Sequence, residues 1–492
     1  MNKFALRKNV VILLFVFVLL SVPFVVAGPT GTDDYYYSQS AKPINGKATL
    51  ADVTKDDLAK QVSHNMFSLD MTWTLLAAFL VMFMQTGFAL VEAGFCRKKN
   101  AHHVFLMNFL VYPIAGFAFF VVGFAIMMGG SNLFPGLNGV FSIHGWNLFG
   151  FKGAFLAGAA YDVGIISLFL FQLVFMDTAA TIVTGAMAER WKFSAFIIFS
   201  LFMGAIIYPV VGAWAWGGGW LSQLGNIGLG TGYRDFAGSG VVHMVGGIAG
   251  LVGAWYLGPR IGRFKDGKPV LFKAHNLGFV IVGTFILAFG WFGFNAGSTL
   301  ASTDLRISVV AVNTMLASFT GAFSAILLSK LKSKLWDGGM AANGMLAGLV
   351  AITAPSGFVN PLSACIIGAI AGVLVYYSVW FFDWIARIDD PVGAISVHGL
   401  CGIWGVLSVG IFSDGTYLGV KGLLYDQTLA GGFGQLLSQV IGVVAIIIWV
   451  SGTSLLFFWI SDKLTGIRVT EKEELTGLDT SVHGMPAYNG DD

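Results

Sequence analysis

Eleven long apolar blocks constrain this 492-residue chain more than any other feature. They lie at about 71–93, 104–128, 161–187, 193–216, 236–257, 277–297, 307–329, 339–354, 361–385, 392–412 and 433–461. None of the 28 lysine and arginine residues falls inside a block. About twenty apolar residues in a helix span the core of a bilayer, whereas a transmembrane barrel shows alternating segments of about ten. The sequence therefore predicts an all-α polytopic membrane protein with eleven transmembrane helices.

Composition excludes most soluble classes of protein. The chain is 56% hydrophobic and 11% charged, while a soluble domain is about 25% charged. The net charge of +2 gives no field that would attract nucleic acid. Cys96, Cys365 and Cys401 lie in or beside apolar blocks, and their spacing matches neither a disulfide framework nor a metal site. We expect no metal, no cofactor and no nucleic-acid partner.

The N-terminus has the pattern of a cleavable signal peptide over residues 1–27. Lys3, Arg7 and Lys8 precede a short apolar run, and Ala27 provides a small residue before Gly28. The alternative is a retained first transmembrane helix. Residues 28–69 are polar, and we expect them to form a loosely ordered extracytoplasmic segment.

The distribution of basic residues predicts the orientation. The loops after the odd-numbered spans 1 to 9, together with the tail, hold 17 Lys and Arg residues, against 4 in the loops after the even-numbered spans 2 to 10. The positive-inside rule then places the mature N-terminus outside and the C-terminus in the cytoplasm. We expect a multi-pass protein of the cell (inner) membrane, surrounded by lipid.

An internal repeat is the most informative pattern. DFAGSGVVHMVGGI at 235–248 and DPVGAISVHGLCGI at 390–403 both read D-x2-G-x3-V-H-x3-G-I, 155 residues apart. Five spans separate the copies, and an odd number inverts the second unit relative to the first. The membrane domain at 70–461 then divides into repeat one at about 71–257, repeat two at about 277–412 and a final helix at about 433–461. Inverted repeats place a substrate site near the midplane, between the units.

The repeat brings one histidine from each half to a similar depth in the membrane. His243 and His398 each lie eight residues after a boundary aspartate, about 12 Å along a helix. A polar group at this depth faces the bundle interior or a pore. The alternative is a purely structural role, in which the two histidines connect two helices. A metal site is disfavoured, because two histidines without a third ligand make a poor metal centre. Asp235 and Asp390 are expected mainly to cap helix N-termini.

Several long motifs occur in a recognisable order. They are TGFALVEAG at 86–94, GAMAER at 185–190, the first repeat extended to 250, GWFGFNAGS at 290–298, DDPVGAISVHG at 389–399 and RVTEKEELTGLD at 468–479. With these motifs the chain resembles the Amt/Mep/Rh ammonium transporter family from about residue 65 to the tail. The WGGG stretch at 216–219 resembles the Amt branch more than the Rh branch.

The resemblance implies a homotrimer in which each subunit has its own narrow pore. It also implies roles for residues: twin pore histidines at His243 and His398; a gate at Phe175 and Phe294; an outer recruitment site for ammonium at Phe171, Phe175, Trp216 and Ser298; a pore-lining aromatic at Trp291; and structural or entrance positions at Asp235, Phe236 and Asp390. The tail at 462–492 is expected to be regulatory and to offer a docking place for a cytoplasmic PII-type signal protein.

Ammonium chemistry agrees with these roles. Aromatic ring faces attract the cation by about 0.5–2 kcal/mol per contact, while a bare ion in an apolar constriction costs several kcal/mol. We therefore expect that ammonium is recruited, loses its proton and passes the imidazoles as neutral ammonia, with the proton moved separately. An ammonium-sensing receptor with little or no flux is the alternative. No nucleophile, metal triad or cofactor motif accompanies the histidines, so we expect no enzymatic activity.

Asp177 departs from the expected pattern, because it is a carboxylate inside the third span, two residues after Phe175. An intramembrane carboxylate is a functional candidate by default. Two residues along a helix is a turn of about 200°, so Asp177 is expected to point away from the Phe175 side. A structural hydrogen bond, involving the hydroxyls of Thr178 and Thr181, is the competing interpretation.

Overall fold

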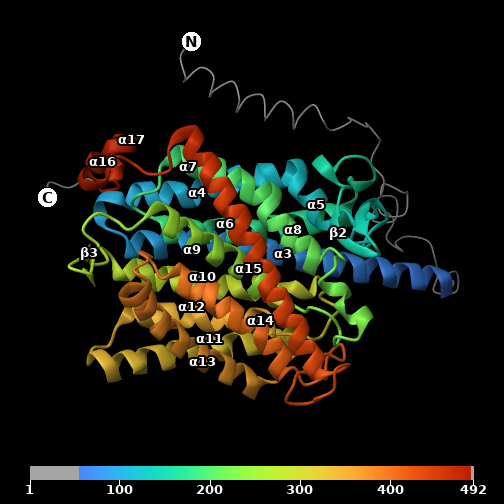
Figure 1. Ribbon diagram of the computed structural model, residues 1–492. Coiled ribbons are helices and arrows are strands. Elements are labelled where there is room, and N and C mark those ends of the chain that lie inside the picture. Colours follow the sequence, from blue (N-terminus) through green and yellow to red (C-terminus); the bar gives the residue numbers. More distant parts are fainter. Residues whose placement is uncertain (1–54, 489–492) are drawn as a thin grey trace, which may run out of the picture.

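The computed structural model describes residues 55–488 as a bundle of long helices that run side by side (Figure 1). The first half contains α3 (Lys55–Phe95), α4 (Ala101–Ala118) continued by η3 (Phe119–Gly123) and α5 (Phe124–Met128), α6 (Val163–Met187), α7 (Phe193–Phe202) continued by η7 (Met203–Ile207) and α8 (Tyr208–Ala215), and η9 (Ser239–Met244) continued by α9 (Val245–Leu257). The second half contains α10 (Leu277–Phe294), α11 (Ile307–Ser333), α12 (Gly338–Thr353), α13 (Pro361–Phe381) continued by η11 (Phe382–Ala386), η12 (Ile395–Leu400) continued by α14 (Cys401–Phe412), and the last long helix α15 (Gly432–Thr465).

The remaining elements are short. They are α16 (Glu471–Thr476), α17 (Leu478–His483), the 3-10 turns η2 (Lys98–Asn100), η4 (Pro135–Leu137), η5 (Ala154–Leu156), η6 (Gly158–Ala160), η8 (Ser222–Ile227) and η10 (Ala296–Thr299), and the antiparallel pairs β1 (Val140–Ile143) with β2 (Trp146–Gly150) and β3 (Phe264–Lys265) with β4 (Lys268–Pro269). We call the end of the bundle with α16 and α17 the tail end, and the opposite end, with β2, the hairpin end (Figure 1).

The predicted all-α polytopic membrane protein is confirmed. Within residues 55–488, ten helical segments are long and apolar enough to cross a membrane. The eighth predicted span is the shorter helix α12, whose 16 residues extend about 24 Å. It stops where the repeat segment crosses it, because the carbonyls of Thr353 and Ala354 accept hydrogen bonds from the backbone of Ala237 and Phe236.

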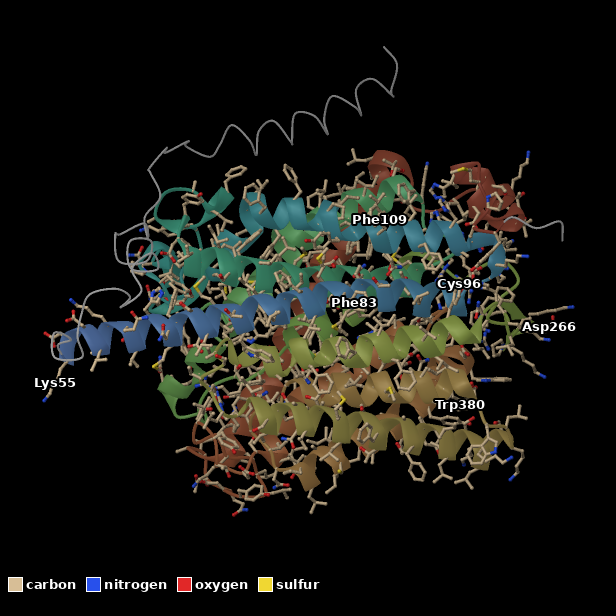
Figure 2. The ribbon with its side chains drawn as sticks, turned by 180° about the vertical axis from the view of Figure 1, so that it is seen from behind. Lys55, Phe83, Cys96, Phe109, Asp266 and Trp380 are labelled. Carbon is tan, nitrogen blue, oxygen red and sulfur yellow. The ribbon has the colours of Figure 1, made fainter. Side chains whose placement is uncertain are left out.

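The helix α3 is longer than predicted. It begins at Lys55 instead of near residue 71, and its first turns extend beyond the body of the bundle at the hairpin end (Figure 2). The expected loosely ordered segment is therefore wrong for residues 55–69, which are helical. The predicted signal peptide and the residues up to 54 lie outside the described part of the chain.

Contacts between helices repeat in the two halves. α3 contacts α6 as α10 contacts α12, α4 contacts α7 as α11 contacts α13, and α6 contacts α9 as α12 contacts α14. The first motif starts at the hairpin end, where the Trp216 indole donates to the Asp235 carbonyl. The second starts at the tail end, where Arg190 donates to the Asp389 carbonyl. The two copies therefore enter the bundle from opposite ends, as an inverted repeat requires.

The D-x2-G part of the motif builds the same helix start twice. The Asp235 carboxylate accepts the backbone N–H groups of Gly238, Gly240 and Val241 at 2.9 Å. The Asp390 carboxylate accepts those of Gly393, Ala394 and Ile395 at 2.7–3.1 Å. The intervening glycine has φ of +119° at Gly238 and +81° at Gly393, a region that L side chains rarely adopt.

A buried ion network joins the loops at the tail end. Arg260 donates to Glu189 at 2.7 Å and to Asp389 at 2.8 Å, and Arg97 also pairs with Glu189. Burial alone would raise the pKa of Asp389, but Arg260 and Arg190 outweigh it and hold that pKa well below its ordinary value. The tail docks beside this network, where Asp479 accepts the N–H groups of His102 and His103 in the first turn of α4 at 3.0 Å.

Candidate functional site

A continuous series of rings runs through the middle of the bundle. Phe171 and Phe175 on α6 have ring centroids 4.4 Å apart, and Phe175 stacks on Phe294 of α10 at 4.1 Å. Phe294 then stacks on His243 at 5.3 Å, and His243 on His398 at 5.2 Å. Phe175, Phe294 and His243 have no exposed surface at all. The structure thus brings together the predicted gate and the predicted pore histidines along one line.

The gate pair comes from helices of different halves. Phe175 lies on α6 of the first half and Phe294 is the last residue of α10 in the second. Their rings stack with an interplanar angle of 26°. Trp291, one turn before Phe294, covers one side of the line: its indole stacks on His243 at 5.4 Å and donates to Thr353 Oγ1 at 3.0 Å. A hydrated ion cannot pass this stack unless the rings move.

The two histidines share a hydrogen bond. Their Nδ1 atoms lie 3.1 Å apart, so in a neutral pair one Nδ1–H donates and the other Nδ1 accepts. It follows that one ring has a bare Nε2 acceptor and the other ring an Nε2–H donor. Nε2 of His243 has no partner among residues 55–488. The pair therefore presents one acceptor and one donor to a small polar molecule.

Both histidines lie in π-helical turns, which the sequence did not predict. His243 is in η9 and His398 is in η12, the segments that follow the two capping aspartates. A π-turn carries an extra residue per turn and occurs often at functional sites. Because the repeat builds it twice, the widened turn accompanies the histidine in each half.

The mouth of the line is at the hairpin end. Trp216 is half-buried, lies 6.2 Å from the Phe175 ring in an edge-on arrangement, and is held by its bond to the Asp235 carbonyl at 2.7 Å. Ser298 is also half-buried, and its Oγ donates to the Phe294 carbonyl at 2.7 Å, which leaves its oxygen lone pairs free to accept. Phe171 lies beside Gly297, the neighbour of Ser298. The four predicted recruitment residues therefore converge.

Phe236 and the two aspartates lie outside the ring series. Phe236 packs edge-on against Phe358 at 5.7 Å and lies against Gly357. Burial raises the pKa of Asp235, and it raises that of Asp390 to about 6, although in both cases the capped N–H groups act in the opposite direction. Their contacts are those of helix caps, which agrees with the structural expectation for both.

Asp177 is buried, with 2% of its surface exposed, and its Oδ1 has no hydrogen-bond partner among residues 55–488. The expected bonds to nearby hydroxyls are wrong: Thr178 donates to the Val174 carbonyl and Thr181 to Gln85. Leu173, one turn earlier on the same face, packs against Gly116 of α4. By the register of α6, Asp177 then lies on the face that is turned toward α4.

A cavity lies below His398, toward the tail end. Besides His398 it is lined by Phe88, Glu92, Asn343 and mainly aliphatic side chains. Phe88 extends the ring series, with its centroid 6.1 Å from that of His398. Sequence analysis did not single out Glu92, although it is an acidic residue inside the first predicted span. No group of three His, Cys, Asp or Glu side chains within residues 55–488 is arranged to hold a metal ion.

Comparison with known proteins points to one family for this chain. A model of the Ammonium Transporter Family matches residues 72–488. The chain is 46% identical over 428 residues to Ammonium transporter Amt2 of Archaeoglobus fulgidus, which covers 85% of this chain and 88% of that protein. Among solved structures, one called Sensor Amt Protein matches with a TM-score of 0.76 and 37% identity, covering 85% of this chain and 99% of that one. Mep2 of Candida albicans matches with a TM-score of 0.70 and 28% identity, covering 82% and 87%.

Proposed function

The chain belongs to the ammonium transporter family, and from this premise we propose that it recruits ammonium at Trp216 and Ser298, deprotonates it and conducts ammonia past His243 and His398. The ring series is the observation that carries the proposal. It joins the half-buried mouth to the histidine pair through rings that are fully buried.

Energetics favours a neutral species at the gate. The mouth offers ring faces to a cation and the Ser298 oxygen to an N–H donor, whereas Phe175 and Phe294 offer neither a charge nor a hydrogen-bond acceptor. Desolvating a bare cation there costs several kcal/mol, while ammonia leaves its charge behind with the proton. Potassium has no proton to lose and is excluded at the same point.

The histidine pair suits the ammonia that arrives. Ammonia donates through N–H and accepts through its lone pair, and the pair presents one acceptor and one donor. Imidazoles also exchange protons near neutral pH, so a proton released at the mouth can travel separately by way of the rings. We propose that transport is proton-coupled in this sense.

The orientation, assembly and partner follow from the sequence analysis. The protein lies in the cell membrane. Because the basic loops occupy the tail end, this end faces the cytoplasm and the hairpin end faces the outside of the cell. The protein works as a homotrimer with one pore per subunit, and the docked tail at 466–488 offers a surface for a PII-type signal protein. The signal peptide at 1–27 is removed.

An ammonium sensor is the second candidate, because the match to the solved structure called Sensor Amt Protein includes 99% of that protein's chain. A sensor would keep the recruitment site and respond through the tail. It differs from a transporter in flux, which can be measured directly.

The test is electrical. Proteoliposomes on a solid-supported membrane receive an ammonium or a potassium jump. We expect current with ammonium only, and its loss in His243→Ala and His398→Ala. His144→Asn, in the exposed hairpin turn, is the matched control that keeps the current. Ammonium binding without current in the wild type would favour the sensor, and a potassium current of similar size would contradict the mechanism.

A further inference from the structure

Glu92 is a buried carboxylate that the proposed transport steps leave unused. It lies on α3 three residues before the helix ends, with 3% of its surface exposed. Thr184 Oγ1 and Asn108 Nδ2 each donate to its Oε2 at 2.8 Å. Within residues 55–488, no lysine, arginine or histidine lies within ion-pair distance of it. The carboxylate therefore has hydrogen-bond donors but no positive partner.

The position of Glu92 relates it to the pore. It lines the cavity below His398, and His398 is the last histidine of the ring series on this side. Cys96, four residues further along the chain and directly after the end of α3, lies close to the tail end in Figure 2. Asn343 also lines the cavity and adds a second polar side chain. A molecule that passes His398 toward the tail end enters this cavity.

A structural role alone does not explain the carboxylate. Thr184 and Asn108 connect Glu92 to α6 and α4, but a neutral side chain makes the same connection two turns away. Gln85 Nε2 donates to the Asn108 carbonyl at 2.6 Å and to Thr181 Oγ1 at 2.7 Å. The amide of Gln85 thus connects these three helices without burying a charge. The presence of a carboxylate at position 92 therefore needs an explanation beyond this connection. A buried carboxylate avoids its desolvation cost by taking up a proton or by pairing with a cation.

We propose that Glu92 is the inner ammonium site of the pore, where ammonia leaving His398 is protonated and held before release. The inference rests on the proposed transport function and assigns a residue to its last step. The protonated Glu92 carboxyl gives its proton to the lone pair of ammonia, so that one O–H bond breaks and one N–H bond forms. The ammonium ion and the carboxylate form a pair. Ammonium then leaves, and the carboxylate takes a proton from a hydronium ion on the tail side.

The test compares the two faces of the protein. Proteoliposomes are sorted by an affinity tag on the C-terminus into tail-out and tail-in populations, and ammonium currents are recorded for each. Glu92→Gln keeps the shape and loses the charge. We expect it to raise the KM for ammonium added at the tail side by about tenfold, the value of one hydrogen-bonded charge contact. The KM at the hairpin side should change far less. Glu92→Asp, which keeps the carboxylate, should remain close to the wild type.

Gln85→Leu is the matched control, because it cuts the neutral connection between the same three helices and leaves the carboxylate. A purely structural Glu92 would make Glu92→Gln resemble Gln85→Leu, with equal losses on both faces, and this result would overturn the inference. If Glu92→Gln does not fold, Glu92→Ala, which also removes the carboxylate, takes its place: a tail-side KM that moves no more than the hairpin-side KM contradicts the proposal. If the wild type carries no current, the proposed function fails. The inner site is then tested by infrared difference spectra, in which ammonium must perturb a carboxylate band that Glu92→Gln lacks.

Discussion

Gly247 of α9 lies against Gly399 of η12 so closely that a Cβ atom on Gly247 would be 2.2 Å from the Gly399 nitrogen. This contact joins the helix after one pore histidine to the π-turn that carries the other. The obstacle is backbone and not a movable side chain, so Gly247→Ala must push the two segments apart. The spacing of the histidine pair depends on the same contact.

We therefore expect Gly247→Ala to lower both stability and ammonium current. Overpacking of this kind costs about 1–3 kcal/mol, and a wider gap weakens the bond between the Nδ1 atoms, now 3.1 Å apart. Thermal unfolding in detergent and the ammonium current measure the two effects. Gly452→Ala is the control, since nothing lies within 4 Å of a Cβ at that helical position. Normal current in Gly247→Ala would show that the crossing tolerates a methyl group.

Phe294 connects the gate to the histidines, because its ring stacks on Phe175 at 4.1 Å and on His243 at 5.3 Å. Phe294→Ala opens the stretch between the mouth and the histidines, where the ring series has no hydrogen-bonding group. We expect it to admit cations, so that a potassium jump, silent in the wild type, produces a current. Phe323→Ala is the control, because that ring lies on α11 with 68% of its surface exposed. Continued potassium exclusion in Phe294→Ala would move the selective step away from this ring.

Trp216 contributes to recruitment through its ring and to positioning through its indole N–H. Trp216→Leu removes one cation–π contact of about 0.5–2 kcal/mol, which corresponds to a KM increase of about 2- to 30-fold at the hairpin side. The maximal current should fall less than the affinity, because the gate and the histidines are retained. Trp255→Leu, on the exposed face of α9, is the control. An unchanged KM would exclude Trp216 from the recruitment site.

The sequence predicted which residues belong to the candidate site better than it predicted their hydrogen-bond partners. The repeat and the resemblance identified His243, His398, Phe175 and Phe294, because histidines in an apolar span and phenylalanines in long motifs stand out by type. The structure brings these residues into one line. For Asp177, the sequence could not show that the neighbouring hydroxyls of Thr178 and Thr181 bond elsewhere.

Other features of the structure correspond to no recognisable pattern in the amino-acid sequence. The π-turns η9 and η12 depend on where backbone hydrogen bonds shift, and the motif that contains them reads as an ordinary helix start. Glu92 was overlooked because it lies one residue before the end of the first predicted span, where a polar residue is ordinary, whereas its importance comes from a cavity that segments distant in the sequence form together. The early start of α3 was missed because residues 55–69 are polar, and hydropathy alone does not distinguish a polar helix from a loop.

Asp389 is the centre of the buried ion network, with Arg260 at 2.8 Å and Arg263 at 3.1 Å. Its side chain has no exposed surface, so Asp389→Ala removes one buried partner from Arg260 and one from Arg263. We expect a loss of about 3–5 kcal/mol in unfolding free energy. Asp383→Ala is the comparison, because Asp383 also pairs with Arg263 but is 26% exposed, and exposed pairs contribute about 1 kcal/mol or less. Equal effects of the two variants would contradict the importance of burial here.

His483 makes the docking of the tail sensitive to pH. It ends α17, and its Nε2 lies 2.9 Å from His103 Nδ1. His102 is near as well, with ring centroids 5.2 Å apart, and Asp479 is the acidic group that acts on His483. Burial and the neighbouring His102 lower the pKa of His483, against the smaller opposite effect of Asp479. The docked tail therefore prefers the neutral imidazole.

The lowered pKa determines in which direction the docking of the tail depends on pH. A histidine whose pKa is depressed in the docked state contributes full stability above its ordinary pKa of about 6.5 and loses it as the pH falls through the docked value. A fluorophore on Val482→Cys, at a partly exposed position of α17, should lose anisotropy between about pH 7.5 and about pH 5 as the helix undocks. His483→Asn keeps a hydrogen-bonding side chain that does not titrate, so its tail should stay docked over this range. A tail that is released equally in both proteins would assign the pH dependence to another group.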